Sequence, residues 1–174
     1  MFKELNILKP FLEEPNREFN VREAARILKI TPATASKKLK EFSKLSILKR
    51  RKERILDLYK ANLEIDACKD LKIYYTIRKL RQSNLIENLN EFYLKPAIIL
   101  YGSSSKGIDT ETSDIDMVII SENTKEFLKK EEYKKKLRKE IHIFAVKKLS
   151  DLKNKNLINN VLNGIVLEGE LIWN

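Results

Sequence analysis

Apolar residues in the second half of the chain come in short runs that predict the strands of a sheet. Residues 97–101 form a continuous apolar run, and residues 114–120 alternate between the two faces that a strand would have. Residues 140–146 alternate in the same way. Two shorter apolar runs, at residues 165–167 and 171–173, predict further short strands near the end.

Between and after these runs, apolar residues recur at helical spacing. Residues 62–94 contain neither proline nor glycine and predict one long helix, or two helices broken near residues 82–84. A last helix is predicted over residues 150–163, with its first residue as the N-cap and Gly164 just after its end. A charged helix is predicted over residues 123–139, and its buried side would consist of Phe127, Leu128 and Leu137.

The first third of the chain has two short helical patterns separated by a tight turn. Asn20 and Glu23 have the spacing of a capping box, in which Asn is the N-cap and Glu reaches back to it. Residues 29–31 interrupt the pattern, and Thr31 followed by Pro32 predicts the start of a second helix. The apolar face of the first helix would consist of Ala24, Ala25, Ile27 and Leu28.

The second of these helices has two faces of different character. One side is expected to pack in a core through Ala35, Leu39, Phe42 and, beyond them, Leu45. The other side is small and basic enough to approach DNA, and it consists of Ala33, Ser36, Lys37 and Lys40. Two short helices joined by a tight turn describe a helix-turn-helix, whose second helix enters the major groove of DNA.

Residues 19–42 resemble the winged helix-turn-helix of prokaryotic regulators. The resemblance implies two wing strands, expected at residues 47–48 and 55–59, with the basic cluster of residues 49–54 at the tip between them. Basic wing residues are expected to contact phosphates, which position a protein on DNA without reading its sequence. The wing residues assigned to this role are Arg50, Arg51 and Lys52. The alternative is a helical packing or dimerisation module whose basic side chains face water.

The composition fits a folded protein of one or two domains. The chain has 174 residues, of which 43% are hydrophobic and 34% charged. No apolar run approaches the roughly 20 residues that cross a bilayer, and the N-terminus lacks the layout of a signal peptide. The single cysteine, Cys68, has no partner for an internal disulfide, and no Cys/His cluster could hold zinc. We therefore expect a cytoplasmic protein that does not bind membranes.

The net charge of +10 is unevenly distributed. Residues 1–60 hold 16 Lys/Arg and 8 Asp/Glu, whereas residues 61–174 hold 19 and 17, so +8 of the excess lies in the first third. This asymmetry is typical of a nucleic-acid-binding domain attached to a nearly neutral one. The alternative is a basic surface that is simply solvated.

Two acids two residues apart on one face of a strand suit the binding of a divalent metal. Mg²⁺ prefers oxygen ligands and is usually held by one or two carboxylates together with nucleotide phosphates. Asp114 and Asp116 would supply the carboxylates. Gly102 and Ser103, at the end of the preceding apolar run, would offer the phosphates a backbone turn without a Cβ and a hydroxyl group.

This arrangement resembles the signature of the nucleotidyltransferase superfamily, which is an apolar strand, Gly-Ser, a spacer of about ten residues and then Asp-apolar-Asp. The resemblance covers roughly residues 95–174 and is strongest to the minimal nucleotidyltransferases of prokaryotes. The alternative is a surface loop with incidental acids. The expected fold is therefore α+β, with an N-terminal winged helix-turn-helix and a C-terminal nucleotidyltransferase-type α/β domain that has a small mixed sheet.

The resemblance implies a role for each residue of the motif. Asp114 and Asp116 would hold two Mg²⁺ ions, and the NTP substrate is expected to be ATP. Gly102 and Ser103 would position the β- and γ-phosphates, and Lys106 would neutralise them. Many relatives have arginine at the last position, and lysine keeps the charge but lacks the bidentate fork.

The superfamily usually has a third carboxylate on the strand that follows the acidic pair. Glu140 is the only acid on that strand, so the resemblance assigns it to the metal site, as a ligand or as the acceptor of the hydroxyl proton. The position could instead correspond to His142, the only histidine of the chain.

The resemblance implies transfer of a nucleoside monophosphate to an acceptor hydroxyl, with release of pyrophosphate. Minimal nucleotidyltransferases resemble antitoxins that adenylylate a partner toxin protein, commonly a HEPN-type ribonuclease. Modification of a small molecule is a second option. The rival from another class is a DNA-binding transcriptional regulator whose second domain senses nucleotide or is inactive.

Three domains follow from these patterns. Residues 1–60 would bind DNA, residues 61–94 would form a helical connector, and residues 95–174 would form the nucleotidyltransferase domain. A winged helix commonly works as a dimer, so a homodimer is compatible with the sequence. No residue identifies the base of the NTP or the sequence of an operator.

Overall fold

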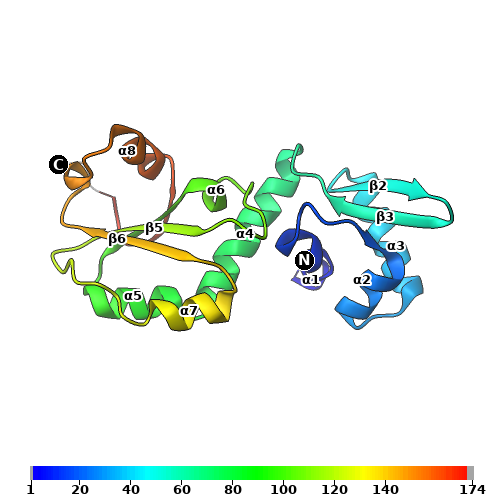
Figure 1. The fold of residues 1–174 in the computed structure, drawn as a ribbon, viewed down its shortest axis with the longest axis horizontal. Coiled ribbons are helices and arrows are strands. Elements are labelled where there is room, and N and C mark those ends of the chain that lie inside the picture. Colours follow the sequence, from blue (N-terminus) through cyan, green and yellow to red (C-terminus); the bar gives the residue numbers. More distant parts are fainter. Residues whose placement is uncertain (1, 172–174) are drawn as a thin grey trace. The chain divides into compact units, whose positions relative to one another are not determined.

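Separate clusters of buried apolar side chains divide the chain into two compact units, Met1–Tyr75 and Thr76–Asn174. The structure is a computed structural model that describes residues 2–171, and it describes the side chains of residues 5–171. Figure 1 shows the elements in the order in which the chain forms them.

The first unit combines helices with a small antiparallel sheet, in which the strand order is β1-β3-β2. Helix α1 has no counterpart among the predicted elements, and it contains Pro10 in its interior. The elements of this unit are α1 (Phe2–Glu13), β1 (Phe19–Asn20), α2 (Val21–Leu28), α3 (Pro32–Lys44), β2 (Leu48–Glu53), β3 (Leu56–Ala61) and the first part of α4 (Asp66–Gln82).

The helix boundaries around the tight turn follow the predicted N-caps. Asn20 Oδ1 accepts a hydrogen bond from the Glu23 N–H at 2.9 Å, and Thr31 Oγ1 accepts one from the N–H three residues on at 3.2 Å. Lys29 ends α2 in the left-handed conformation, with φ of 54°. The second half of the predicted capping box is wrong, because the Glu23 carboxylate pairs with Arg17 instead of the Asn20 N–H.

Burial in the first unit departs from the prediction at the ends of α2 and α3. Ala35 and Leu39 are fully buried, as predicted. Leu45 was expected in the core but is 65% exposed, because it is the C-cap of α3 and no longer follows the helical stripe. Ile27 is likewise 43% exposed, and the small residues Ala24 and Ala25 are the buried residues of α2.

The basic cluster was predicted at the tip between two strands, and this is wrong. The cluster lies along a strand. The pairing of β2 with β3 runs from Leu48 opposite Ala61 to Glu53 opposite Leu56. Residues 49–53 are therefore strand residues, and the turn consists of residues 54–55.

The first part of α4 belongs to the core of the first unit. Leu71 and Tyr75 pack against its apolar cluster. Lys72 is 2% exposed, and its Nζ donates a hydrogen bond to the Leu12 carbonyl at the end of α1. The Tyr75 hydroxyl donates to Glu13 at 2.7 Å. These contacts attach α4 to the last turn of α1.

The second unit begins within α4 and has a four-stranded sheet. The predicted break between two helices is confirmed, because Asn84 is left-handed, with φ of 65°, between α4 and the next helix. The remaining elements are α5 (Leu85–Tyr93), β4 (Ala97–Tyr101), α6 (Gly102–Ser105), β5 (Ile115–Ile120), α7 (Lys130–Leu137), β6 (Ile141–Val146), the 3₁₀-helix η1 (Leu149–Asp151), α8 (Lys155–Leu162) and β7 (Ile165–Glu168).

The strand order of this sheet is β6-β5-β4-β7. β4 pairs antiparallel with both β5 and β7, whereas β5 and β6 are parallel. All five residues of β4 are buried, as expected for a central strand. The predicted α+β class with a small mixed sheet is therefore confirmed for this unit.

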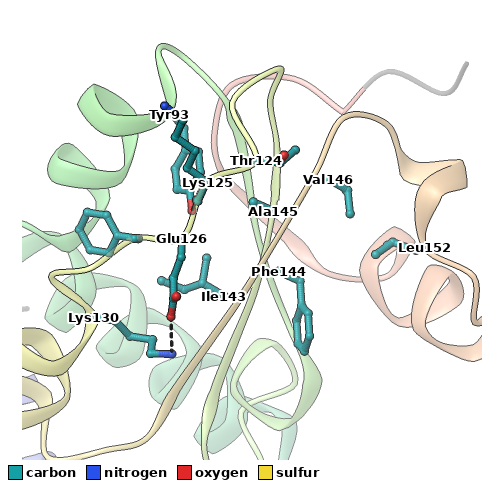
Figure 2. Close-up of a pocket in the computed structure, with 11 residues that line it drawn as sticks. Tyr93, Thr124, Lys125, Glu126, Lys130, Ile143, Phe144, Ala145, Val146 and Leu152 are labelled. Atoms are coloured by element: carbon teal, nitrogen blue, oxygen red, sulfur yellow. Dashed lines mark hydrogen bonds and ion pairs between the residues drawn. The ribbon is translucent and has the colours of Figure 1, made fainter.

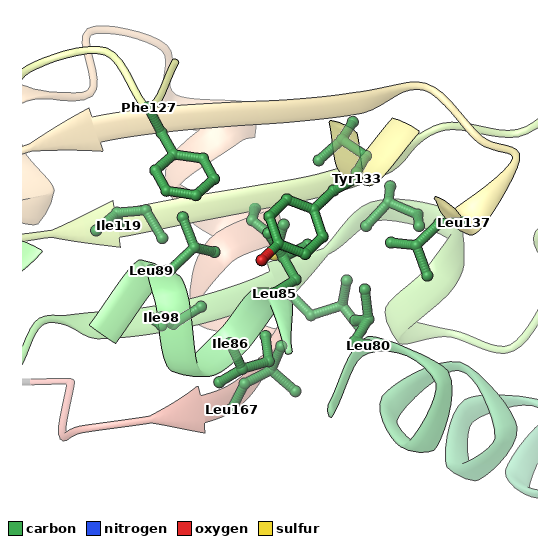
Figure 3. Packing of buried hydrophobic residues seen from close by; sticks show 14 of the residues in the cluster. Leu80, Leu85, Ile86, Leu89, Ile98, Ile119, Phe127, Tyr133, Leu137 and Leu167 are labelled. Atoms are coloured by element: carbon green, nitrogen blue, oxygen red, sulfur yellow. The ribbon is translucent and has the colours of Figure 1, made fainter. Parts of the chain in front are cut away.

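Alternation along the strands divides the apolar residues between two clusters. Ile115, Met117 and Ile119 pack in the larger cluster with residues of α5 and α7, part of which Figure 3 shows. Val118 and Tyr101 pack in a second cluster with residues of η1 and α8. Helices therefore cover both faces of the sheet, and β4, β5 and β6 each contribute side chains to both clusters.

The helix predicted over residues 123–139 is shorter than expected, since only Lys130–Leu137 is helical. The Asn123 side chain accepts the Lys125 N–H at 3.2 Å and donates to a carbonyl at the end of α5, which favours a loop. Phe127 and Leu137 are buried as predicted, but Leu128 is 83% exposed because it lies in this loop.

The end of the second unit also differs from the prediction. Asn154 caps α8 by accepting two backbone N–H groups, whereas Ser150, the predicted cap, lies within η1. Gly164 is not left-handed, and a Cβ there would lie 2.6 Å from the Leu100 carbonyl oxygen, so glycine is needed for close packing. β7 matches the strand predicted at residues 165–167, and the strand predicted at residues 171–173 lies largely outside the described residues.

Candidate active site

Asp114 and Asp116 lie at the start of β5. Asp116 is part of the strand and Asp114 directly precedes it. Their side chains are 42% and 27% exposed, whereas Ile115 and Met117 are buried in the larger apolar cluster. The alternation of the strand therefore leaves both carboxylates at the surface.

Both carboxylates approach the imidazole of His142 on the neighbouring strand. His142 Nδ1 is 3.2 Å from Asp116 Oδ1 and 3.8 Å from Asp114 Oδ2. This contact follows from the parallel register of β5 and β6, in which Asp116 is opposite His142. The Ile115 N–H donates to the Glu140 carbonyl at 2.9 Å, which extends the same register to the start of β5.

The turn after β4 touches the second of these carboxylates. Gly102 has φ of 74°, and a Cβ at this residue would lie 2.7 Å from Asp116 Oδ2. Glycine is thus required both for the left-handed conformation and for the approach of the carboxylate. The structure therefore brings the predicted Gly102 turn and Asp116 into direct proximity.

Hydrogen bonds hold the short helix α6 in place beside the acids. The buried Ser105 Oγ donates to the Gly102 carbonyl at 2.9 Å, and the buried Ser104 Oγ reaches the Asp114 carbonyl at 3.4 Å. The Ser103 carbonyl accepts two N–H groups, including that of Lys106 at 3.2 Å. The side chain of Ser103 is half-buried and that of Lys106 is exposed, so both can reach a ligand from solvent.

The Glu140 carboxylate has a different partner. It forms an ion pair with Lys134 Nζ at 2.7 Å, and this hydrogen bond is the main reason why the pKa of Lys134 is raised. His142, which the sequence analysis offered as the alternative, is the side chain that contacts both aspartates.

A second ion pair fixes the loop between the turn and β5, and no sequence motif pointed to it. Lys139 Nζ contacts Asp109 Oδ2 and the Thr110 carbonyl, both at 2.7 Å. Asp109 is 2% exposed, so this pair lies largely out of solvent. The two partners are far apart in sequence, and only the fold shows that they meet.

Tyr101 lies opposite Asp116 in the pairing of β4 with β5. Burial, followed by the negative charge of Asp116, raises the pKa of Tyr101 to about 12. The phenol therefore stays neutral at physiological pH and does not add a negative charge beside the aspartates.

Two of the residues present, Asp114 and Asp116, have the chemistry to bind a divalent cation. In the described part of the chain, no group of three or more His, Cys, Asp and Glu side chains is spaced to hold a metal ion. Asp114 and Asp116 nevertheless supply carboxylate oxygens, which hard cations prefer, at one exposed point. A phosphate-bearing ligand at the adjacent turn would supply the further oxygens that Mg²⁺ usually requires.

Two pockets flank β6. A pocket of about 440 Å³ lies between residues 111–114 and a wall formed by α7 and residues 138–140, so Asp114 and Glu140 both line it. The other pocket, of about 310 Å³, lies between β6 and residues 124–130, and Figure 2 shows Phe144 and Lys130 among its lining side chains. Neither aspartate lines this second pocket.

The residues predicted to bind DNA lie on α3 and β2 of the first unit. On α3, Ala33, Lys37 and Lys40 are exposed and Ser36 is half-buried. Of the three residues of β2 that were assigned to DNA binding, two already have partners within the unit. Arg50 pairs with Asp57 at 2.9 Å, Arg51 pairs with Glu18 at 2.7 Å, and the third, Lys52, is exposed.

Comparison with known proteins supports a nucleotidyltransferase domain in the second unit. Residues 82–167 match the family model described as nucleotidyltransferase domain, and this segment includes the Gly102 turn and both aspartates. The match supports nucleotidyl transfer in general. No curated protein matches the chain.

A solved structure described as a possible transcriptional regulator from Methanosarcina mazei Go1 is also similar. The two chains are 23% identical, the similarity covers 53% of this chain and 78% of that one, and the TM-score is 0.37. A similarity of this extent does not assign a function. Among the helices of residues 2–171, none combines the length and the apolar character needed to span a membrane.

Proposed function

We propose that this chain transfers a nucleoside monophosphate from an NTP, which we expect to be ATP, to an acceptor hydroxyl with release of pyrophosphate. The proposal rests on one observation, which is that the partly exposed carboxylates of Asp114 and Asp116 both approach His142 Nδ1, with Asp116 against the Gly102 turn. The match of residues 82–167 to the nucleotidyltransferase domain supports it.

The residues of the site would have two roles: some would bind the metal and the others would bind the phosphates. Asp114 and Asp116 would hold Mg²⁺, with two ions in the complete site. Bound Mg²⁺ lowers the pKa of an attacking hydroxyl and stabilises the charge on the attacking and leaving oxygens. Gly102 and Ser103 would position the β- and γ-phosphates through the backbone and the hydroxyl, and Lys106 would neutralise them.

The third carboxylate assigned by the resemblance is Glu140. In the structure this carboxylate is paired with Lys134, so it would have to exchange that partner for the metal or the acceptor hydroxyl. His142 already contacts both aspartates and needs no such exchange.

We propose that the first unit is a winged helix-turn-helix that binds DNA. Helix α3 would enter the major groove, and the β2–β3 hairpin would be the wing. The exposed lysines of α3, Lys37 and Lys40, and the exposed Lys52 of β2 support contacts with phosphates. Arg50 and Arg51 would share their guanidinium groups between phosphates and their present acidic partners. A homodimer would present two such units to one DNA site.

The acceptor that we favour is a hydroxyl group on a partner protein, as in antitoxins that adenylylate a toxin. This choice rests on the resemblance to minimal nucleotidyltransferases, and a small molecule is the second option. DNA binding by the first unit agrees with it, because an antitoxin can repress its own operon.

Transfer is tested with two labelled forms of ATP and a cell lysate as the source of acceptor. Label in the α-phosphate should appear on an acceptor in the presence of Mg²⁺, whereas label in the γ-phosphate should leave with pyrophosphate. Asp114→Asn should abolish the transfer. Asp70→Asn, which changes an exposed carboxylate of α4 in the first unit, should leave it unchanged.

The class of labelled molecule identifies the acceptor. Label on a protein supports the antitoxin reading, label on RNA indicates a tailing enzyme, and undiminished transfer by the Asp114→Asn variant removes the assignment. The second candidate function is a transcriptional regulator, which the basic first third of the chain favours. Absence of transfer together with specific, salt-sensitive DNA binding would select it.

A further inference from the structure

Strand β6 forms one edge of the four-stranded sheet. Within the described chain its one neighbouring strand is β5. At the two ends of β6, the carbonyls of Glu140 and Val146 accept the N–H groups of residues 115 and 121 at 2.9 Å. The backbone of the even-numbered residues therefore points towards β5, and the alternate residues direct their N–H and C=O groups away from the sheet. These outward residues are Ile141, Ile143 and Ala145, and no described residue hydrogen-bonds their backbone groups.

The edge strands β1, β2 and β7 each have a protection that β6 lacks. β1 is only two residues long, and five of the six residues of β2 are charged. Arg81 donates a hydrogen bond to the Leu167 carbonyl of β7 at 2.7 Å. The six residues of β6 include no Lys, Arg, Asp, Glu or Pro. Short length, charge, proline and covering groups are what keep an edge strand from pairing with another chain, so β6 is the open edge of this fold.

The surroundings of β6 leave room along this edge. A pocket of about 310 Å³ lies between β6 and residues 124–130, so this segment does not close against the strand. Figure 2 shows Ile143 on one side of β6 and Phe144 and Val146 on the other. Phe144, in the middle of the strand, is 49% exposed. A strand added at this edge would cover its ring.

We propose that β6 pairs antiparallel with β6 of a second copy of this chain, which joins the two four-stranded sheets into one continuous sheet. In such strand addition, main-chain hydrogen bonds hold the two chains together. Ile143 and Ala145 would exchange N–H and C=O hydrogen bonds with the outward residues of the second copy. This interface is independent of nucleotidyl transfer, and it would supply the homodimer proposed above.

The charges that flank β6 fit a second copy in one register. Outward residues can face only outward residues, so the twofold axis passes through a residue, which is either Phe144 or the one before it. With Phe144 on the axis, Glu140 lies opposite the partner's Lys148, and the same pair recurs at the other end. With the axis one residue earlier, Lys139 would lie opposite the partner's Lys147, which places like charges together. Opposite charges therefore favour the register centred on Phe144.

Both charged residues of this register are accessible in the structure. Lys148 is exposed, and its extended backbone, with φ of −146° and ψ of 159°, has the geometry of a strand. The Glu140 side chain is 59% exposed, so it can bridge Lys134 and the partner's Lys148. At the centre, the two half-exposed Phe144 rings would cover each other. The chain thus supplies both halves of a complementary pair of strands.

Sedimentation velocity of the full chain over a range of concentrations measures self-association, and a dimer is expected. Ala145→Pro removes an outward N–H of β6 but no hydrogen bond to β5, and proline is tolerated at such a position of an edge strand. This variant should weaken the dimer about tenfold or more and keep the native circular dichroism spectrum. Ala145→Ser retains the N–H, is the matched control, and should dimerise like the native chain.

Phe144→Cys tests the register. Residues that face each other in a non-hydrogen-bonded antiparallel pair have Cα atoms about 4.5 Å apart, which a disulfide can span. Under oxidation this variant should form a covalent dimer, because its thiol would meet its copy at the twofold axis. Val166→Cys, exposed on β7 at the other edge of the sheet, is the control and should remain uncrosslinked. The native Cys68 is buried and should not react.

A native chain that sediments as a monomer at every concentration would overturn the inference, and the open edge would then be left to a strand of another protein. A dimer that withstands Ala145→Pro, or that Phe144→Cys does not crosslink, would place the interface elsewhere and overturn it as well. If Ala145→Pro does not fold, the crosslink alone decides. The transfer assay with labelled ATP separates the two proposals. A monomer that transfers nucleotide overturns only the β6 interface, and a crosslinked dimer without transfer overturns only the transferase.

Discussion

Gly102 and Asp116 constrain each other at the scale of single residues. The glycine has φ of 74°, and the carboxylate occupies the space that a Cβ would need. The Asp116 carboxylate packs against the glycine and contacts His142 Nδ1 at 3.2 Å, and both neighbours restrict it in the structure without metal or nucleotide. Pre-organisation of this kind is what a site requires if its ligands are to bind without rearrangement.

Substitution of Gly102 by Ala tests this constraint. The added Cβ would lie 2.7 Å from Asp116 Oδ2 and force a left-handed alanine, so we expect the free energy of unfolding to fall by about 1–3 kcal/mol. We also expect metal-dependent ATP binding to be lost, which calorimetry measures. Gly164→Ala is the control, because its Cβ would meet the Leu100 carbonyl and destabilise the fold without touching the aspartates. Native ATP binding by Gly102→Ala would contradict the account.

Tyr101 predicts a pH dependence of stability. Its pKa is raised from 10.0 to about 12, first by burial and then by Asp116. The pKa of Tyr101 is higher in the folded than in the unfolded chain. The contribution of the neutral phenol to the free energy of unfolding is therefore complete below about pH 10 and is lost as the pH rises towards 12. Both proteins can lose stability over that interval, but the loss in free energy of unfolding should be about 1–3 kcal/mol smaller for Tyr101→Phe than for the native chain. Urea unfolding across the interval measures the difference, and identical pH profiles would contradict the expectation.

Single residues differ in how well the sequence predicts them. The acids of β5 and the Gly102 turn could be predicted because their signal is local, consisting of alternation along one strand and a glycine at its end. The contacts of His142 with the aspartates depend on the register of two parallel strands. Likewise, the pair Asp109–Lys139 joins distant segments. A single sequence does not specify contacts of this kind. His142 was therefore only an alternative for the site, and the Asp109–Lys139 pair was not predicted.

Capping determines where the elements of the helix pair begin. Asn20 accepts the Glu23 N–H at 2.9 Å, so Asn20→Ala should lower the free energy of unfolding by about 1 kcal/mol. Asn20→Asp retains the accepting oxygen and should preserve stability. Chemical denaturation of the three proteins measures both effects. Equal stability of the alanine variant and the native chain would show that this cap does not stabilise α2.

Helix α3 is the element whose exposed face we propose to contact DNA. The double variant Lys37→Ala, Lys40→Ala should weaken binding to all DNA sequences. It should also reduce the slope of log K against log salt concentration by about 2, because each lysine releases counterions from one phosphate. Fluorescence anisotropy at several salt concentrations measures the slope. An unchanged slope would place the DNA contacts elsewhere.

Elements with strong local signals were predicted more accurately than those set by their surroundings. Thr31 with Pro32 marked the start of α3, and the apolar run of β4 coincides with the observed strand. Helix α1 was missed, and its interior Pro10 is a residue that usually ends a helix. Residues 123–139 have a helical composition, but side-chain hydrogen bonds of Asn123 hold the first part as a loop.

The chain as a whole combines a basic unit with a nearly neutral one. Residues 1–75, the first unit, hold 18 Lys/Arg and 11 Asp/Glu and so carry +7 of the net charge of +10, and the acidic pair lies in the second unit. Individual strands could be predicted from alternation, and the α+β class with a small mixed sheet is what the resemblance implied. The boundary between the units could not be predicted from the pattern, because it falls within α4, where the helical pattern continues without a break. Two units with separate cores suit two separable activities.

The most direct test of the account is calorimetric titration of the full chain with a non-hydrolysable ATP analogue, with and without a divalent cation. The account predicts binding that requires the cation and that falls about tenfold or more in Asp116→Asn. The double variant Lys37→Ala, Lys40→Ala, altered only in the first unit, should bind the analogue like the native chain. Binding that is independent of the cation, or that is unchanged in Asp116→Asn, would contradict the central claim.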